Sequence, residues 1–572
     1  MRKEAREAPV SLLPAWLSGG PVALSTIGLI VGTLFFAASL SPSLIPRTWH
    51  MQGVLSGLSL AAGYATGVAL RWCWAYLELP VPSRPAQRLL LALAALACLV
   101  VAVIFLRQAS EWQNSIRVLM AMDTVDTARP LRVAMLALPL FALILVFSRA
   151  FLFTFRLISG RLHRYVPRRI SHGLGVVLAV AVFWSVIDGV LLAGLMRALD
   201  SSFQQFDALM EPEVAAPEDP ARTGSAASPV AWGTLGRTGR NFVSSGPSLA
   251  ALQAFHGEGV DKPIRVYIGL NSAEDIQARA RLAVEELDRT GAFDRTVLVI
   301  ATPTGTGWLD PSAIDTLEYL HRGRVATVAL QYSYLPSWLS LLSEEDYGAE
   351  SARALFEAIY GHWTQLPRDT RPRLYLHGLS LGALNSERSA DLFDVIADPF
   401  HGALWSGPPF RSQAWRTITN SREPDSPAWL PRFRDGSIVR FTHQHNALAL
   451  PGATWGPIRI VYLQYASDPV TFFEPQSFYR QPEWMQPPRG PDVSERLRWY
   501  PVVTMLQLAI DIIAADEAPM GFGHRYAPEH YIDAWLEVSE PPDWHPEDIE
   551  RLKTWFRTRS GHAPPDETIS RP

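Results

Sequence analysis

The sequence contains very little cysteine. Of its 572 residues two are cysteines, Cys73 and Cys98, and both lie in apolar stretches near the N-terminus. The rest of the chain therefore offers no disulfide framework, zinc-binding cysteine cluster or thiol nucleophile. An excess of charge of one sign is lacking too, because 51 basic residues face 55 acidic ones and the formal net charge is -4. Without a clustered basic surface, we expect no nucleic-acid partner.

The N-terminal third is rich in long apolar runs. Five runs lie at about 22–40, 53–75, 88–106, 131–149 and 173–196. Each approaches the ~20 residues that a helix needs to cross a ~30 Å hydrocarbon core. They are apolar on all faces, whereas buried helices of soluble domains are amphipathic. The first run lacks the cleavage site of a signal peptide. Residues 1–200 are thus predicted to form an α-helical transmembrane domain of about five helices.

The basic residues of the loops predict how this domain is oriented. With the N-terminus in the cytoplasm, twelve Arg and Lys side chains lie inside and six outside, as the positive-inside rule favours. The inside set is Arg2, Lys3, Arg6, Arg71, Arg84, Arg88, Arg149, Arg156, Arg161, Arg164, Arg168 and Arg169; the outside set is Arg47, Arg107, Arg117, Arg129, Arg132 and Arg197. An odd number of spans then places the C-terminal domain outside the cytoplasm.

Two features inside the apolar runs are unusual. The pairs Gly53/Gly57 and Gly63/Gly67 have the small-xxx-small spacing that lets helices approach closely. Packing within the bundle is the favoured interpretation, and a homo-oligomer formed through these helices is the alternative. Asp188 lies in the fifth run, where a carboxylate must be paired or hydrated. It fits either a polar path or a partner such as a helix-end arginine.

A linker rich in Glu, Asp, Pro, Ala, Gly and Ser follows at 201–235, and the pattern then changes. Short β-branched runs alternate with longer amphipathic stretches such as 273–290 and 349–365, which predicts an α/β fold with a mostly parallel sheet over residues 236–572. The expected strands are Ile264–Leu270, Thr296–Ala301, Val325–Tyr332, Arg373–His377, Ala403–Ser406 and Ile458–Tyr465.

The strongest catalytic motif is Gly378-Leu379-Ser380-Leu381-Gly382, which fits Gly-x-Ser-x-Gly. In this motif the serine lies on a sharp turn between a strand and a helix, and the flanking glycines let neighbouring backbone pass close by. The stretch Gly57-Leu58-Ser59-Leu60-Ala61 nearly matches it, but lies inside an apolar run. Because Ser380 follows an apolar strand and precedes a small-residue helix start, we predict Ser380 as the nucleophile.

The acid of such a site comes next along the chain, at the end of a later strand. Asp468 ends the apolar strand of "RIVYLQYASDPV" and is our predicted acid, although a simple Asp-Pro turn would look similar. Three other aspartates lie on or after the helix that follows Ser380, where they are badly placed to orient a histidine: Asp391, Asp394 and Asp398.

The base is expected in a loop near the C-terminus. His524, among glycines in "PMGFGHRYAPEH", is our predicted base, while His530 looks like part of the following helix. His443 and His445 precede the acid and so come in the wrong order. A His-x-His pair without further ligands is a poor metal signal, so we predict neither a metal nor a cofactor.

An oxyanion hole requires two backbone N–H donors. We predict the amide of Leu381 as one donor. The second is expected from the loop after an early strand, where Thr304, Gly305 and Thr306 begin the stretch "TGTGW". This glycine-rich loop lacks the lysine of a phosphate-binding P-loop.

Nearly the whole chain resembles one family. The stretches "SPSLIPR", "TPTGTGWLDP", "GLSLGALNSE", "VYLQYASDPV" and "GFGHRYAPEHYIDAW" are similar to the bacterial α/β-hydrolases with an N-terminal multi-helix membrane region, α/β-hydrolase family 9. The resemblance implies Ser380, Asp468 and His524 as nucleophile, acid and base, in a multi-pass protein of the bacterial inner membrane. The chain departs from the family at Phe522, where a second histidine is frequent, and at Leu379, where an acidic residue is common.

Taken together, these patterns predict a membrane-bound serine hydrolase. It would act as an esterase or lipase on hydrophobic acyl esters through an acyl-enzyme, with the lipid bilayer as its other partner. Two alternatives are an acyltransferase with the same three residues and a non-catalytic sensor or transport-related protein. The stretches "SYLPSWLSLL" and "PEWMQPP" fit an acyl pocket or lipid contact, and fit ordinary packing equally well.

Overall fold

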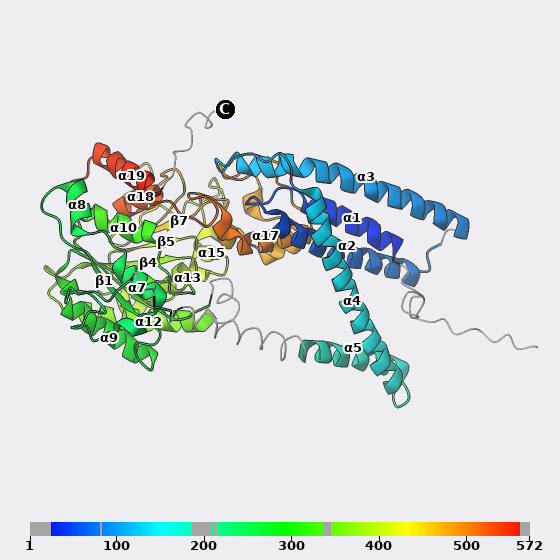
Figure 1. Ribbon diagram of the computed structural model, residues 1–572, viewed down its shortest axis with the longest axis horizontal. Coiled ribbons are helices and arrows are strands. Elements are labelled where there is room, and N and C mark those ends of the chain that lie inside the picture. Colours follow the sequence, from blue (N-terminus) through cyan, green and yellow to red (C-terminus); the bar gives the residue numbers. More distant parts are fainter. Residues whose placement is uncertain are drawn as a thin grey trace, which may run out of the picture.

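The computed structural model describes residues 24–80, 83–185, 207, 209, 210, 214–335 and 345–560. A group of long helices from the N-terminal third extends to one side of an α/β domain (Figure 1). These helices are α1 (Thr26–Ser39), α2 (Trp49–Tyr76), α3 (Arg84–Arg117), α4 (Pro130–Leu162) and α5 (Arg168–Trp184).

Three of these helices, α2, α3 and α4, are long and apolar enough to cross a membrane. The prediction of about five spans is therefore supported for three helices among the described residues. Helix α1 is apolar but has 14 residues, because the Ser25 side chain caps its first turn by accepting from the amide of Gly28 at 3.2 Å. The fifth predicted run is described as far as residue 185, and Asp188 lies outside the described residues.

The glycine pairs of α2 lie at helix contacts within the chain. A Cβ atom on Gly67 would lie 2.5 Å from the carbonyl oxygen of Ile27, and one on Gly63 would lie 2.7 Å from that of Val31, both in α1. Gly53 and Gly57 lie against α4 in the same way. Both pairs thus bring helices of one bundle together, which is the use expected of small residues between apolar helices.

The α/β domain is built on a parallel sheet. Its seven strands lie in the order β1-β3-β2-β4-β5-β7-β6, and all six neighbouring pairs are parallel. This confirms the predicted fold class. The strands are β1 (Ile264–Ile268), β2 (Val297–Thr302), β3 (Val325–Leu330), β4 (Arg373–Leu379), β5 (Gly402–Ser406), β6 (Val439–Thr442) and β7 (Arg459–Leu463).

Six of the seven strands were expected from the sequence, and β6 was not. It has four residues, and one of them is Arg440, which is out of place in an apolar strand pattern. Arg440 is nevertheless buried, because its guanidinium donates to the carbonyls of Gly436 and Leu448, both at 2.8 Å. These hydrogen bonds let a charged side chain lie inside the fold.

Helices cover both faces of the sheet (Figure 1). Helices α9 and α12 pack together on one face, and α10 and α18 pack together on the other. The helices of this domain are α7 (Gly236–Ser244), α8 (Leu249–His256), α9 (Ile276–Arg289), α10 (Pro311–Leu320), α12 (Glu345–Trp363), α13 (Leu381–Glu387), α14 (Leu392–Val395), α15 (Gln413–Asn420), α16 (Pro469–Phe472), α17 (Val503–Ile513), α18 (Pro528–Ser539) and α19 (Pro546–Ser560).

The N-terminal helices are joined to the α/β domain by a buried junction. Leu44 and Ile45, in the loop between α1 and α2, are fully buried and belong to the core of the α/β domain. The amide of Leu44 donates to Asp511 at 3.1 Å, and Gln507 donates to the carbonyl of Ser41 at 3.1 Å. Asp511 and Gln507 lie on α17, which runs beside α1 and α2 (Figure 1). The N-terminal helices therefore pack against the α/β domain through a buried contact and help to hold α17 in place.

Candidate active site

Ser380 lies on the sharp turn that the motif predicts. It stands between β4, which ends at Leu379, and α13, which begins at Leu381. Its φ of 57° and ψ of -125° are rare for a residue with a side chain. Such a strained turn brings the serine to the carboxyl end of the sheet, where loops can reach it.

Two glycines make this turn feasible. A Cβ atom on Gly378 would lie 2.3 Å from the carbonyl of Gly382, and one on Gly382 would lie 2.2 Å from the carbonyl oxygen of Thr302. No side chain fits at such distances. The start of α13 therefore rests directly on the end of β2, where the predicted oxyanion loop begins.

His524 and Asp468 are brought together from two distant segments. Nδ1 of His524 lies 2.7 Å from Oδ2 of Asp468. Asp468 follows β7 and caps α16, because its Oδ1 accepts from the amide of Val470 at 2.8 Å. It is completely buried, so the carboxylate is held by hydrogen bonds and not by water. Gly407, after β5, leaves room beside this pair, since a Cβ there would lie 2.7 Å from the imidazole.

The environment of His524 favours its protonated form. Burial by itself lowers the pKa of the imidazole, but the charge and hydrogen bond of Asp468 outweigh it and the net pKa is raised above 6.5. The other ring nitrogen, Nε2, is buried and has no partner among the described residues. This arrangement leaves Nε2 available to exchange a proton with a group in the adjoining cavity.

Tyr526 is a residue of the site that the sequence reading missed. Its hydroxyl donates to Oδ2 of Asp468 at 2.6 Å, so tyrosine and histidine share one carboxylate oxygen. Tyr526 stacks on Tyr465, whose hydroxyl accepts from the amide of Ala527 at 3.0 Å. Its position two residues after His524 is a sequence signal, but the contact with Asp468 depends on the fold.

A buried polar network holds the loop that carries His524. The hydroxyl of Ser467 accepts from the amide of Gly523 at 2.9 Å and donates to Asp492 at 2.6 Å. Gln444 donates to the same carboxylate at 2.7 Å and to the carbonyl of Gly521 at 3.2 Å. The residue before His524 is thus hydrogen-bonded to the side chain of the residue before Asp468, which helps to fix the position of the histidine relative to the aspartate.

The loop that we predicted to supply the second oxyanion donor lines the same cavity as Ser380. The amide of Thr304 donates to the carbonyl of Trp308 at 2.9 Å, so it is engaged within its own loop. The amides of Leu381 and Thr306 have no hydrogen-bond partner among the described residues. Gly307 has a φ of 84°, and its carbonyl accepts from Tyr267 at 2.8 Å, which anchors the loop.

A cavity of about 880 Å³ connects these groups. Ser380, Leu381, His524, Thr304 and Thr306 all line it. Much of the remaining lining is apolar: Leu379, Pro409, Val470, Ile512, Ile513 and Met520. Asp310 also lines the cavity, and burial raises the pKa of its carboxyl to about 6. A volume of this size accommodates a substrate much larger than a short-chain ester.

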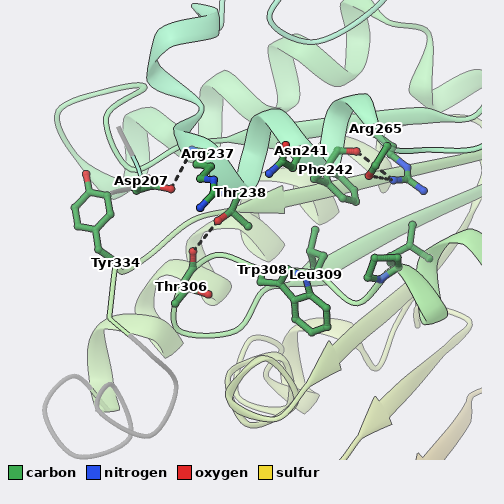
Figure 2. Close-up of a pocket in the computed structure, with 13 residues that line it drawn as sticks. Asp207, Arg237, Thr238, Asn241, Phe242, Arg265, Thr306, Trp308, Leu309 and Tyr334 are labelled. Atoms are coloured by element: carbon green, nitrogen blue, oxygen red, sulfur yellow. Dashed lines mark hydrogen bonds between the residues drawn. The ribbon is translucent and has the colours of Figure 1, made fainter. Parts of the chain in front are cut away.

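A second cavity of about 380 Å³ adjoins the oxyanion loop at Thr306 and Trp308 (Figure 2). Thr306, Trp308 and Pro311 line both cavities. Thr238 of α7 braces the loop by donating to the carbonyl of Thr306 at 3.4 Å. Arg265 lines this second cavity too, but its charge is balanced by Asp315 and Glu318 at 2.5 and 2.8 Å.

The other histidines considered in the sequence have structural surroundings. Nδ1 of His530, in α18, lies 2.5 Å from the hydroxyl of Tyr465. His443 packs edge-on against Trp429 and His445. Among the residues that the structure describes, no group of three or more His, Cys, Asp and Glu side chains is arranged to hold a metal ion.

The comparisons with known proteins agree with this architecture. A family model described as "Alpha/beta-hydrolase family" matches residues 264–552, and its companion, "Alpha/beta-hydrolase family N-terminus", matches residues 40–247. The chain therefore belongs to the α/β-hydrolase family, specifically to family 9, as the sequence resemblance implied. No curated protein and no solved structure matches this chain.

Proposed function

We propose that this protein is a membrane-anchored serine hydrolase that cleaves acyl esters of hydrophobic substrates. The observation that carries the proposal is the convergence of Ser380, His524 and two unengaged backbone amides on one cavity. Family membership supports a hydrolase fold, and the roles of the individual residues are our assignment.

In the proposed mechanism, Nε2 of His524 removes the proton of the Ser380 hydroxyl as its oxygen attacks the acyl carbonyl. Asp468 holds the imidazole in the required tautomer and stabilises the imidazolium. The amides of Leu381 and Thr306 would stabilise the oxyanion. His524 then gives its proton to the leaving alcohol, and water, activated in the same way, releases the acid from the acyl-enzyme.

The lining of the cavity supports a hydrophobic substrate. Ile512 and Ile513, at the end of α17, line it beside Met520. The same helix packs against α1 and α2, and its Gln507 and Asp511 bind the loop between them at Ser41 and Leu44. An apolar helix thus joins the catalytic cavity to the apolar helices, which supports a substrate drawn from a membrane. We propose a location in the bacterial inner membrane, with the α/β domain outside the cytoplasm.

Two sequence stretches considered for substrate contact are not used in this proposal. Trp484 and Met485, of "PEWMQPP", are buried in the core of the α/β domain. Most of "SYLPSWLSLL" lies outside the described residues.

Hydrolysis of a series of p-nitrophenyl acyl esters by the purified full-length protein tests this function. We expect turnover that favours medium and long acyl chains, and a loss of about 1,000-fold or more in Ser380→Ala. An acyltransferase would transfer the acyl group to an added alcohol in preference to water. Binding of the esters without turnover would favour the sensor alternative and would contradict the proposal.

A further inference from the structure

The junction between the membrane helices and the α/β domain contains a cavity of about 540 Å³. It lies where α1 ends and α2 begins, beside the C-terminal half of α3 and the start of α4. Its lining combines apolar residues such as Leu40 and Trp49 with the cationic side chains of Arg47, Arg117 and Arg129. None of these residues belongs to the proposed catalytic site.

Arg47 is the most informative residue of this cavity. Its side chain is 8% exposed, and Nη2 donates to the carbonyls of Ser39 and Ser41 at 3.3 and 2.7 Å. The other two nitrogens, Nε and Nη1, are enclosed and have no partner among the described residues. Buried donors of a charged group are normally satisfied, and the guanidinium fork suits a bidentate oxyanion. Arg47 lines the cavity, and an anion held there would meet this requirement once the guanidinium turned these two nitrogens toward it.

The face of α3 that lines the cavity changes from apolar to polar. Leu106, Ala109, Gln113 and Arg117 follow one another at helical spacing along this face. Leu106 and Ala109 belong to the apolar part of the helix, while Gln113 and Arg117 belong to its polar end. A molecule in contact with the whole face would need an apolar part and a polar, anionic part.

The charges around the cavity favour an anion. Arg117 is half-buried, and its Nε donates to the carbonyl of Asp123 at 2.5 Å. A carbonyl is neutral, so this hydrogen bond does not balance the positive charge of Arg117. Arg129 is exposed at the start of α4. The carboxylates of Asp126 and Glu517 also line the cavity, so three cations face two anions there. Asp511 acts electrostatically on Arg47 from α17.

From these observations we infer that the junction cavity binds the phosphate group of a membrane phospholipid. The cavity lies at the ends of apolar helices, which is the level of lipid headgroups, and Trp49 is a residue type enriched there. Arg47, with Arg117, would contact the phosphate, and the acyl chains would follow the apolar part of α3. This site goes beyond the proposed hydrolase activity and is independent of it, but it rests on the proposed membrane location.

The junction cavity and the catalytic cavity are lined by neighbouring residues of the sequence. The short helix η7 (Ala515–Glu517) separates the two: Ala515 and Asp516 line the catalytic cavity, and Glu517 lines the junction cavity. A lipid bound at the junction would therefore lie against the segment that forms one wall of the catalytic cavity.

Native mass spectrometry of the full-length protein in detergent micelles tests this inference. The protein carries Ser380→Ala in every sample, so that turnover cannot remove the lipid. It is titrated with phosphatidylglycerol, with diacylglycerol of the same acyl chains, and with inorganic phosphate. The variants are Arg47→Gln and Arg117→Gln. Arg117→Gln keeps the hydrogen bonds from Arg47 to Ser39 and Ser41. A loss of binding in this variant therefore cannot be attributed to the loss of those structural hydrogen bonds. The matched control is Arg107→Gln, because Arg107 is exposed on α3 and does not line the cavity.

We expect one bound phosphatidylglycerol per chain, with an affinity about tenfold or more weaker in Arg47→Gln and Arg117→Gln and unchanged in Arg107→Gln. Diacylglycerol should bind at least about tenfold more weakly than phosphatidylglycerol, since it lacks the phosphate. The inference is overturned if Arg117→Gln and Arg107→Gln bind the phospholipid equally, or if diacylglycerol binds as tightly. Binding of inorganic phosphate without phospholipid would also overturn it.

Discussion

Tyr526 donates a hydrogen bond of 2.6 Å to Oδ2 of Asp468, the oxygen that also lies 2.7 Å from Nδ1 of His524. Both donors come from one loop, two residues apart. The other oxygen, Oδ1, accepts from the amide of Val470, so both oxygens of the carboxylate are held. In our account Tyr526 positions the acid and does not touch the substrate.

Replacing Tyr526 by Phe therefore tests a positioning role. The hydrogen bond to a buried carboxylate is lost while the stacked ring is kept, and we expect serine reactivity to fall by about tenfold. The rate of labelling by a fluorophosphonate measures this, with thermal unfolding as the check on folding. Tyr375→Phe, at a buried tyrosine of β4 that does not line the cavity, is the matched control and should change the rate by less than about threefold. Equal effects in the two variants would contradict the assignment.

The raised pKa of His524 predicts an acid limit on reactivity. The base must be neutral, and Asp468 holds the pKa of the imidazole above 6.5, so labelling should rise with pH with a midpoint above 6.5. In Asp468→Asn the charge and the hydrogen bond that raise the pKa are gone and burial, which lowers it, remains. The residual labelling of this variant should accordingly have its midpoint below that of the wild type. A midpoint that stays in place would show that another group sets the limit.

The two glycines beside Ser380 should be irreplaceable. In Gly378→Ala the new methyl group would meet the backbone of Gly382 at 2.3 Å, so the turn must distort. We expect loss of labelling and destabilisation of about 2 kcal/mol or more. Gly361→Ala is the control, because Gly361 lies in α12 with no other atom within 4 Å of the added Cβ. Circular dichroism should show that the control unfolds at the same temperature or slightly higher.

The half-buried carboxyl of Glu387, at the end of α13, predicts a pH-dependent stability. Burial raises the pKa of Glu387 to about 8 from 4.5, although Ser412 and Tyr462 donate to it. Between pH 4.5 and about 8 the native state therefore holds a proton that the unfolded chain has released. The free energy of unfolding should fall as the pH rises through this window.

Glu387→Gln removes this titration. The variant should be more stable than the wild type at pH 8 by on the order of 2 to 4 kcal/mol, and its stability should depend less on pH. Thermal or denaturant unfolding at several pH values measures both effects. The exposed Glu357→Gln in α12 is the control and should change stability by less than about 0.5 kcal/mol. Parallel pH profiles for wild type and Glu387→Gln would contradict this account.

Local patterns were enough to predict the main parts of the fold. The β-branched runs predicted six of the strands, and the glycines around Ser380 predicted the strand-to-helix turn. Both features depend on residues that are close together in the sequence. Strand β6 was not predicted because it contains Arg440. This side chain can be buried only because carbonyl groups of the surrounding residues accept hydrogen bonds from it. The start of α1 is set by the cap at Ser25, and a hydropathy pattern gives no sign of such a cap.

The chain order of the motifs suggested the pairing of Asp468 with His524, but other contacts between distant segments could not be predicted from the sequence. The meeting of Tyr526 with Asp468 joins residues 58 positions apart, and the insertion of Leu44 beside Asp511 joins residues 467 apart. The engagement of the Thr304 amide with Trp308 depends on the turn geometry of one loop. Neither hydropathy nor motif spacing carries this information, since it arises from packing of the whole chain.

The central claim is that Ser380 is an activated nucleophile, and fluorophosphonate labelling in membranes tests it most directly. The chain provides its own control, because Ser59 stands in the same Gly-Leu-Ser-Leu sequence but is buried inside α2. We predict that wild type and Ser59→Ala are labelled, while Ser380→Ala and His524→Ala, expressed at the same level, are not. Labelling that persists in Ser380→Ala, or a wild type that stays unlabelled while a reference hydrolase in the same membranes reacts, would contradict the account.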